Sequence, residues 1–125
     1  MDQTLITGVK FVAVYVDHFE TNFEFYNKVL GLEKAYEMGG NACFFHLGKN
    51  FGLYLEGGNK KNEIDRKTMR STFVMQVESA TATFEKLNKA GVKLVQDAPV
   101  DMGEGEFWFQ FYDPSGNILE ILGGE

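Results

Sequence analysis

Residues 9–31 carry two hydrophobic periodicities in succession. Residues 9–16 are rich in β-branched side chains and alternate between a uniformly apolar set and a mixed set, the period-two pattern of a strand with two distinct faces. Asp17, with Glu20 three residues later, is suited to cap a helix whose apolar stripe runs until Gly31. The apolar strand positions are Val12, Val14 and Val16, and the mixed ones are Phe11, Ala13 and Tyr15.

Three strand-like runs and a polar segment follow this helix. The runs cover residues 32–37, 42–47 and 51–56, and the Gly-Gly-Asn and Gly-Lys-Asn triplets between them favour tight turns. Residues 58–68 are polar and rich in Gly, Asn and Lys, which is typical of a linker. Residues 8–57 therefore form a predicted βαβββ module.

The same pattern starts again after the linker. Residues 73–78 align without a gap on residues 12–17, and the match continues in register into the following helix. Because the register is kept through both elements, we interpret the match as an internal duplication rather than a chance likeness. The second set of elements is a strand over 73–78, a helix from Ser79 to Gly91, a strand that begins at Val92, and strands over 107–112 and 117–122 joined by the turn 113–116. The chain is predicted to be one α+β domain over 1–125, with the second module over 69–123.

Composition and charge narrow the function classes. The chain of 125 residues is 44% hydrophobic, enough to bury a core, and its formal net charge is -6 with no basic cluster, which argues against a nucleic-acid partner. No apolar stretch approaches membrane-spanning length, and residues 1–4 lack the basic start of a targeting signal. The only cysteine, Cys43, has no partner for an intramolecular disulfide. We expect a cytoplasmic protein with no nucleic-acid or membrane partner.

Three segments of the chain resemble one known superfamily. They are Val12 to Asp17, the phrase FYxxVLGL at residues 25–32 and the phrase DPxGNxxE at residues 113–120. In this order and separation they resemble the vicinal oxygen chelate superfamily, which includes glyoxalases, extradiol dioxygenases, fosfomycin-resistance enzymes and bleomycin-binding proteins. The resemblance implies that two βαβββ modules form a curved, partly open mixed sheet with helices on its outer face. It also implies a site in the hollow of the sheet and a homodimer.

The resemblance further implies where a metal ion would bind. Members take their ligands from one inward position on the first and fourth strands of each module, and these positions fall here on Phe11, Tyr54, Thr72 and Glu120. Only Glu120 matches the usual ligand types, although Glu56 lies two residues after Tyr54, and an open catalytic site generally needs about three protein ligands. We therefore predict no metal ligands and no bound cofactor, with a divalent metal ion as the alternative.

Strand alternation predicts an aromatic and acidic lining for the hollow. Such a lining favours a flat or cationic small molecule through stacking, cation–π attraction and charge pairing. Glu120 lies between Leu119 and Ile121, so a central strand would place its carboxylate in the hollow, where it is the predicted catalytic residue and would act as a general base without metal. The predicted ligand-binding residues are Phe11, Tyr15, Tyr54, Glu56, Thr72, Gln76, Trp108, Gln110 and Tyr112.

The histidines and the cysteine are weaker candidates for chemistry. His18 falls in the first helical turn, where a surface or capping role is expected. Cys43 and His46 are three residues apart on a strand, so they point to opposite faces and cannot form a nucleophile and base pair. We predict structural roles for these residues.

Three functions are compatible with these observations. The first is a binding protein, antibiotic-sequestering or metabolite-binding, that holds a small aromatic or cationic molecule in a metal-poor pocket. The second is a metal-dependent lyase or dioxygenase in which Glu120, with Tyr54 or Glu56 and either with or without His46, forms an unorthodox metal site. The third is a non-catalytic dimeric scaffold. Bound metal would separate the enzyme from the binding protein.

Overall fold

The computed structural model describes residues 5–125 and contains the same βαβββ arrangement twice. In the first module the elements are β1 (Val12–Tyr15), α1 (Phe19–Glu24) with a following π-helical turn (Phe25–Val29), β2 (Lys34–Glu37), β3 (Ala42–His46) and β4 (Gly52–Glu56). In the second module they are β5 (Val74–Ser79), α2 (Ala80–Lys89), β6 (Val100–Gly103), β7 (Glu106–Tyr112) and β8 (Ile118–Gly124). Residues 1–4, on which the expectation about targeting rests, lie outside the described part.

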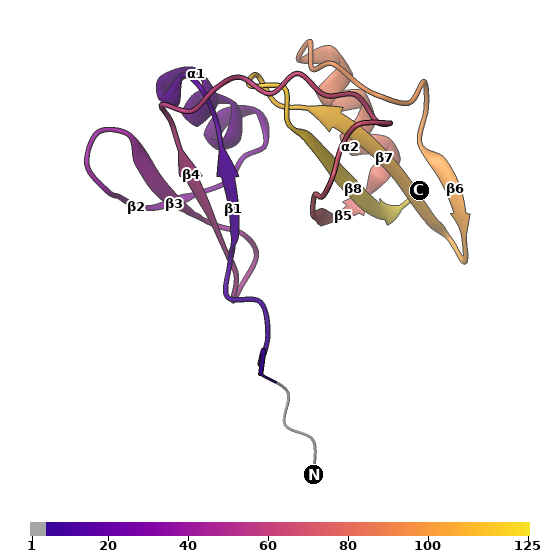
Figure 1. Ribbon diagram of the computed structural model, residues 1–125. Coiled ribbons are helices and arrows are strands. Elements are labelled where there is room, and N and C mark those ends of the chain that lie inside the picture. Colours follow the sequence, from indigo (N-terminus) through magenta and orange to yellow (C-terminus); the bar gives the residue numbers. More distant parts are fainter. Residues whose placement is uncertain (1–4) are drawn as a thin grey trace.

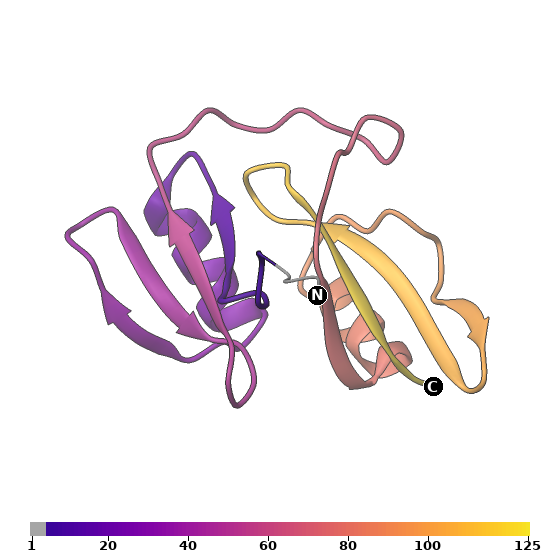
Figure 2. The ribbon, with the colours of Figure 1, turned by 60° about the horizontal axis from the view of Figure 1, so that its bottom comes forward.

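Each module contributes one four-stranded mixed sheet. The strand orders are β1-β4-β3-β2 and β5-β8-β7-β6, with the first pair of each order parallel and the others antiparallel. The two modules lie side by side, and the linker crosses from β4 to the second module before β5 begins (Figures 1 and 2). The predicted α+β fold is confirmed, and the sheet is open because β1 and β5 are edge strands.

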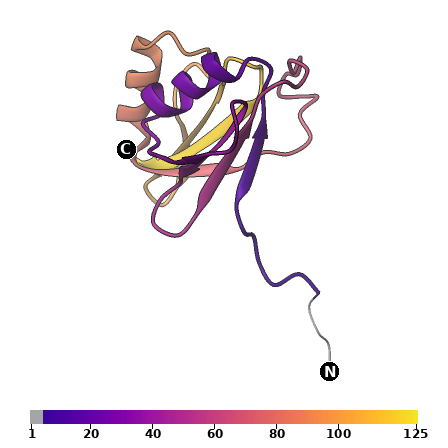
Figure 3. The same cartoon turned by 90° about the vertical axis from the view of Figure 1, so that its left-hand side faces the viewer.

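One hydrophobic core serves both modules. Both helices lie on the same side of the sheets (Figure 3), and the apolar strand positions Val14, Val16 and Met75 are buried, at 5%, 0% and 9% exposure. The core is continuous between modules, since the rings of Phe25 and Phe111 have centroids 6.2 Å apart. The predicted assignment of the valine face to the core is therefore confirmed.

Polar contacts from the turn after β7 join this turn to the first module. The Tyr26 hydroxyl donates to Asp113 Oδ2 at 2.7 Å, and the Asp17 backbone N–H donates to Ser115 Oγ at 2.9 Å. The Asn117 side-chain amide donates to the Tyr15 carbonyl at 3.1 Å. These bonds fix the position of one module relative to the other.

Two local predictions are wrong. Asp17 does not cap α1 with Glu20, because its carboxylate accepts instead from the His18 N–H at 2.7 Å and from the Asn22 side chain at 3.3 Å, and His18 takes the capping position. The strand predicted to begin at Val92 does not form as a regular strand. Residues 93–95 bond to β7 through two backbone hydrogen bonds and one isolated bridge, and the second strand of this module begins only at Val100. By contrast, Ser79 caps α2 as expected, accepting from Ala82 N–H at 3.0 Å.

Within residues 5–125, no helix is long and apolar enough to cross a membrane. The segment before β1 projects from the body of the protein (Figure 1) and carries three strongly exposed apolar residues, Leu5, Ile6 and Val9, at 94%, 71% and 70% exposure.

Candidate functional site

The residues predicted to line the hollow lie on the sheet face opposite the core. In the first sheet, Tyr15 pairs with Glu56, two residue pairs beyond Ala13 and Tyr54 and on the same face. In the second sheet, Val74, Glu120 and Gln110 lie in one row across β5, β8 and β7, and Gln76, Leu122 and Trp108 lie in the next row. Strand pairing therefore groups the predicted residues into a first-module set and a second-module set.

The first-module set forms an aromatic surface with a carboxylate at its end. The Tyr54 ring lies 6.4 Å from the ring centroids of both Phe11 and Tyr15, and 5.2 Å from that of Phe44. The Tyr54 hydroxyl donates to Glu56 Oε1 at 2.7 Å, and this bond raises the pKa of Tyr54. Tyr15 is half exposed, at 52% of its residue surface, and we expect its ring to be available for stacking.

The second-module set is a hydrogen-bonded network centred on Gln110, which is 1% exposed. Glu120 accepts from Trp108 Nε1 at 2.7 Å and, through its other oxygen, from Gln110 Nε2 at 3.0 Å. Gln110 Oε1 in turn accepts from Gln96 Nε2 and Arg66 Nε, both at 2.9 Å. The Glu120 carboxylate thus lies on the predicted face, with a neutral donor on each oxygen.

The linker covers part of this second set. Arg66 contacts Gln110, and the Tyr112 hydroxyl donates to the Ile64 carbonyl at 3.3 Å. The Lys93 ammonium lies 4.6 Å from the Tyr112 ring centroid, so this ring faces a cation of its own module. The sequence indicates a linker here but gives no sign that it returns to the sheet.

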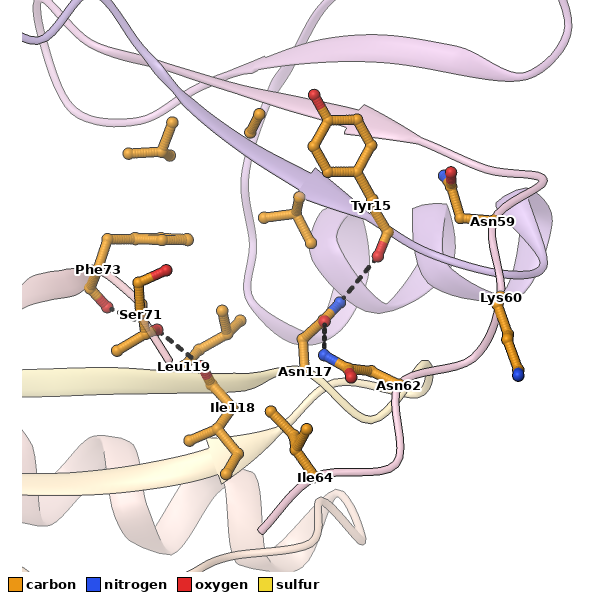
Figure 4. Close-up of a pocket in the computed structure, with 14 residues that line it drawn as sticks. Tyr15, Asn59, Lys60, Asn62, Ile64, Ser71, Phe73, Asn117, Ile118 and Leu119 are labelled. Atoms are coloured by element: carbon orange, nitrogen blue, oxygen red, sulfur yellow. Dashed lines mark hydrogen bonds between the residues drawn. The ribbon is translucent and has the colours of Figure 1, made fainter. Parts of the chain in front are cut away.

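A cavity of about 490 Å³ lies between the modules (Figure 4). Tyr15 and Thr72 are the residues of the predicted set that line it, whereas Phe11, Tyr54, Glu56, Gln76, Trp108, Gln110, Tyr112 and Glu120 lie outside its lining. Its other walls come from the edge of β1, the linker, the segment before β5 and the start of β8. The predicted residues therefore surround the cavity only in part.

Asparagine side chains that the sequence analysis missed shape one end of this cavity. Asn62 Nδ2 donates to Asn117 Oδ1 at 2.9 Å, and Asn117 Nδ2 contacts the Tyr15 carbonyl (Figure 4). Asn59 is in the lining as well. The available signals were the cluster of asparagines in the linker and the asparagine inside the DPxGNxxE phrase.

The residues at the metal-ligand positions of the family do not fit a divalent ion. Phe11 has no donor atom, and the Thr72 hydroxyl donates to a backbone carbonyl at 2.7 Å. The Tyr54 hydroxyl is bonded to Glu56, and both oxygens of Glu120 already accept from nitrogen donors. In the part of the chain that the structure describes, no three His, Cys, Asp or Glu side chains gather where they could hold a metal ion.

The remaining candidates for chemistry do not form a dyad. Cys43 is fully buried and His46, three residues along β3, is exposed, so they face opposite sides as predicted. Burial raises the pKa of the Cys43 thiol to about 11. Burial also raises the pKa of Asp113, against the opposing effect of hydrogen bonds from Tyr26 and Asn117, and this carboxylate joins the modules rather than facing the cavity.

Comparisons with known proteins agree with this architecture. The family model described as the Glyoxalase/Bleomycin resistance protein/Dioxygenase superfamily matches residues 8–121. An integron cassette protein from the mobile metagenome of the Halifax Harbour sewage outfall is 24% identical, with 94% of this chain and 99% of that chain covered and a TM-score of 0.72. Lactoylglutathione lyase from Agrobacterium tumefaciens is 18% identical, with 97% and 96% covered and a TM-score of 0.71.

A variant of the fosfomycin resistance protein FosX from Listeria monocytogenes, solved with Mn(II) and a dihydroxypropylphosphonic acid, is 17% identical, with 97% of this chain and 95% of that chain covered and a TM-score of 0.75. At these identities the solved structures show a shared fold alone. Because the family model matches nearly the whole chain, the protein belongs to the glyoxalase/bleomycin resistance protein/dioxygenase superfamily.

Proposed function

We propose that this protein binds a small molecule carrying a flat aromatic or cationic group in the cavity between the modules. The volume of about 490 Å³ is in the range of small-molecule sites, which run from about 300 to about 1,000 Å³. The observation that carries the proposal is the half-exposed Tyr15 ring in the wall of this cavity, on the strand next to Glu56.

Recognition would combine stacking, charge and hydrogen bonding. An aromatic or cationic group can stack on Tyr15, a contact worth about 0.5–2 kcal/mol for a cation. Glu56 lies outside the lining but is paired with Tyr15 in the strand register, so its carboxylate would act on a bound cation through its charge rather than by contact, against the opposing charge of Lys60 in the lining. The side-chain amides of Asn59 and Asn62 would orient polar groups of the ligand at the linker end of the cavity.

No chemical step is required for this function. Each oxygen of Glu120 accepts one hydrogen bond, from Trp108 or Gln110, and the carboxylate is outside the lining of the cavity. The roles predicted for Glu120 as a general base or as a metal ligand therefore find no support in its contacts. We propose binding, not turnover, as the activity of this site.

The test is a calorimetric titration with three probes: benzylamine, benzoate and methylphosphonate. We expect benzylamine to bind most tightly, and Tyr15→Ala to weaken it by about 1–2 kcal/mol, or about 5- to 30-fold in Kd. Glu56→Gln should weaken benzylamine but not benzoate. Tyr36→Ala is the matched control, since Tyr36 is a 55% exposed tyrosine of the same sheet that lies outside the cavity lining. Binding of methylphosphonate alone, or equal affinities of wild type and Tyr15→Ala, would contradict the proposal.

We also propose that the protein forms a homodimer through the segment before β1. Leu5, Ile6 and Val9 are exposed on a projecting segment (Figure 3), and a second copy of the chain is the partner expected from the family. Replacing all three with serine should convert a dimer to a monomer in sedimentation equilibrium. A wild-type protein that sediments as a monomer would contradict this proposal and the scaffold function with it.

A further inference from the structure

The linker holds a cation against the second module. Tyr112 donates to the Ile64 carbonyl at 3.3 Å, Arg66 Nε donates to Gln110 Oε1 at 2.9 Å, and Gln110 Nε2 lies 3.7 Å from Met69 Sδ. These contacts come from Ile64, Arg66 and Met69, so the C-terminal part of the linker and the residue after it lie against the second sheet.

A tight turn presents Arg66 to the sheet. Asp65 Oδ1 accepts from the backbone N–H groups of Lys67 and Thr68 at 2.9 and 3.0 Å, and together with the Thr68 hydroxyl these donors hold the pKa of Asp65 below its usual value. Arg66 is the first residue inside this turn. Its position is therefore set by local backbone geometry and not only by its own contacts.

The guanidinium group of Arg66 stacks on the face of Trp108, with Cζ 5.4 Å from the ring centroid. The same indole donates to Glu120, so a carboxylate lies at the edge of the ring. Within residues 5–125 the direct ion pairs are Lys28–Glu24 and Lys34–Glu37, so the charge of Glu120 is not neutralised by a direct ion pair. An aromatic face, an amide oxygen and a nearby carboxylate are the features that recognise a planar cation.

We infer that Trp108, Gln110 and Glu120 form a subsite for a planar cation of the guanidinium class, and that Arg66 occupies this subsite as a tethered competitor. The inference rests on the proposed function, for which it names a second contact surface and the residue that controls access to it. Arg66 covers part of the half-buried Trp108 ring, so a free ligand competes with the Arg66 side chain for this contact, and Arg66 sets the affinity of the subsite.

Trp108 provides the readout, because it is the only tryptophan of the chain. Methylguanidinium is the probe, since it does not absorb where tryptophan is excited, and acetate is the probe of opposite charge. We expect Arg66→Ala to lower the Kd of methylguanidinium, measured by Trp108 emission, by about tenfold, which corresponds to about 1.4 kcal/mol. Adding Glu120→Gln to Arg66→Ala should reverse most of this gain.

Lys67→Ala is the matched control, because it removes a neighbouring exposed cation from the same turn and should leave the Kd at the wild-type value. Equal affinities of wild type and Arg66→Ala for methylguanidinium would overturn the inference. Tighter binding of acetate to wild type than to Arg66→Ala would overturn it as well, because Arg66 would then be an anion ligand. Since Tyr15 and Glu56 belong to the other module, failure of this inference and failure of the benzylamine titrations are distinguishable: the first changes only the methylguanidinium results, the second only those of Tyr15→Ala and Glu56→Gln.

Discussion

Replacing Tyr26 with Phe removes one hydroxyl group from the junction between the modules while the ring packing stays. The Tyr26 side chain is fully buried, and its hydroxyl donates to Asp113 Oδ2 at 2.7 Å. The rings of Phe25 and Phe45, with centroids 5.5 and 6.3 Å from that of Tyr26, would contact a phenylalanine in the same way. The change therefore isolates one hydrogen bond to a buried carboxylate.

The size of the stability loss depends on the hydrogen bonds that Asp113 still accepts in the variant. Its Oδ1 still accepts from the Ser115 and Asn117 backbone N–H groups, and its Oδ2 still accepts from the Asn117 side chain. Hydrogen bonds to charged groups contribute about 1.5–3 kcal/mol, and with three donors left we expect a loss of about 2 kcal/mol in the free energy of unfolding at pH 7.

The pH dependence of this loss gives a second observable. Burial raises the pKa of Asp113 in the folded protein above 3.8, so between 3.8 and the raised value the folded state holds more protons than the unfolded state. Stability contributed by this group therefore falls as the pH rises through that window. Without the Tyr26 donor the folded pKa of Asp113 rises further, so the loss caused by Tyr26→Phe is complete at neutral pH and shrinks as the pH falls toward 3.8.

Urea unfolding measures both effects. With an m-value of about 2 kcal/mol per molar, a loss of about 2 kcal/mol lowers the midpoint by about 1 M. Tyr36→Phe is the control, since Tyr36 is exposed and its replacement should change stability by less than about 0.5 kcal/mol. A Tyr26→Phe variant as stable as this control at pH 7, or a loss that stays constant down to pH 4, would refute the reasoning.

Other predictions concern the core, a glycine turn and metal. The Cys43 thiol, with its pKa raised from 9.0 to about 11, should react with a disulfide reagent at pH 8 at least about 100-fold more slowly in the native protein than in urea. Gly116→Ala should cost about 3 kcal/mol in urea unfolding, because a Cβ at this positive φ would clash with the Asn62 carbonyl oxygen, whereas Gly91→Ala, at a similar φ but in open space, should cost about 1 kcal/mol. Mn(II), Zn(II), Ni(II) and Fe(II) should leave the melting temperature of wild type and Glu120→Gln unchanged; stabilisation that Glu120→Gln removes would restore the metalloenzyme hypothesis.

Periodicity predicts much of this fold because the core needs only one face of each strand. In the first module Val14 and Val16 are buried and Tyr15 between them is exposed. In β5 Met75 is buried and its neighbour Gln76 is exposed, as the alternation indicates. The error at Val92 has a different origin. Residues 93–95 do bond to β7, but the segment leaves the sheet before Pro99, and local apolar character cannot show where pairing stops.

For the candidate site, the sequence predicts which face of the sheet the residues occupy but not which other residues contact that face. Strand alternation places Trp108, Gln110 and Glu120 on one surface, and strand pairing confirms that they share it. Which residues then contact this surface depends on the path of a polar segment that has no periodicity, and this path is set by side-chain hydrogen bonds such as those of Asp65. Composition identifies a linker, but it cannot place Arg66 on Trp108.

The position of Arg66 affects which part of the predicted aromatic and acidic lining a ligand can contact. In the second-module half of the hollow, the Arg66 guanidinium already contacts the Trp108 ring and the Gln110 amide oxygen, although it makes no direct ion pair with Glu120. In the first-module half, Tyr15 is half exposed, the linker residue Lys60 lines the same cavity, and the hydrogen bond that the Glu56 side chain receives comes from its neighbour Tyr54. Tyr15 and Arg66 act on opposite modules, so the affinity of a ligand for Tyr15 and its competition with Arg66 should be separable by single substitutions on each module.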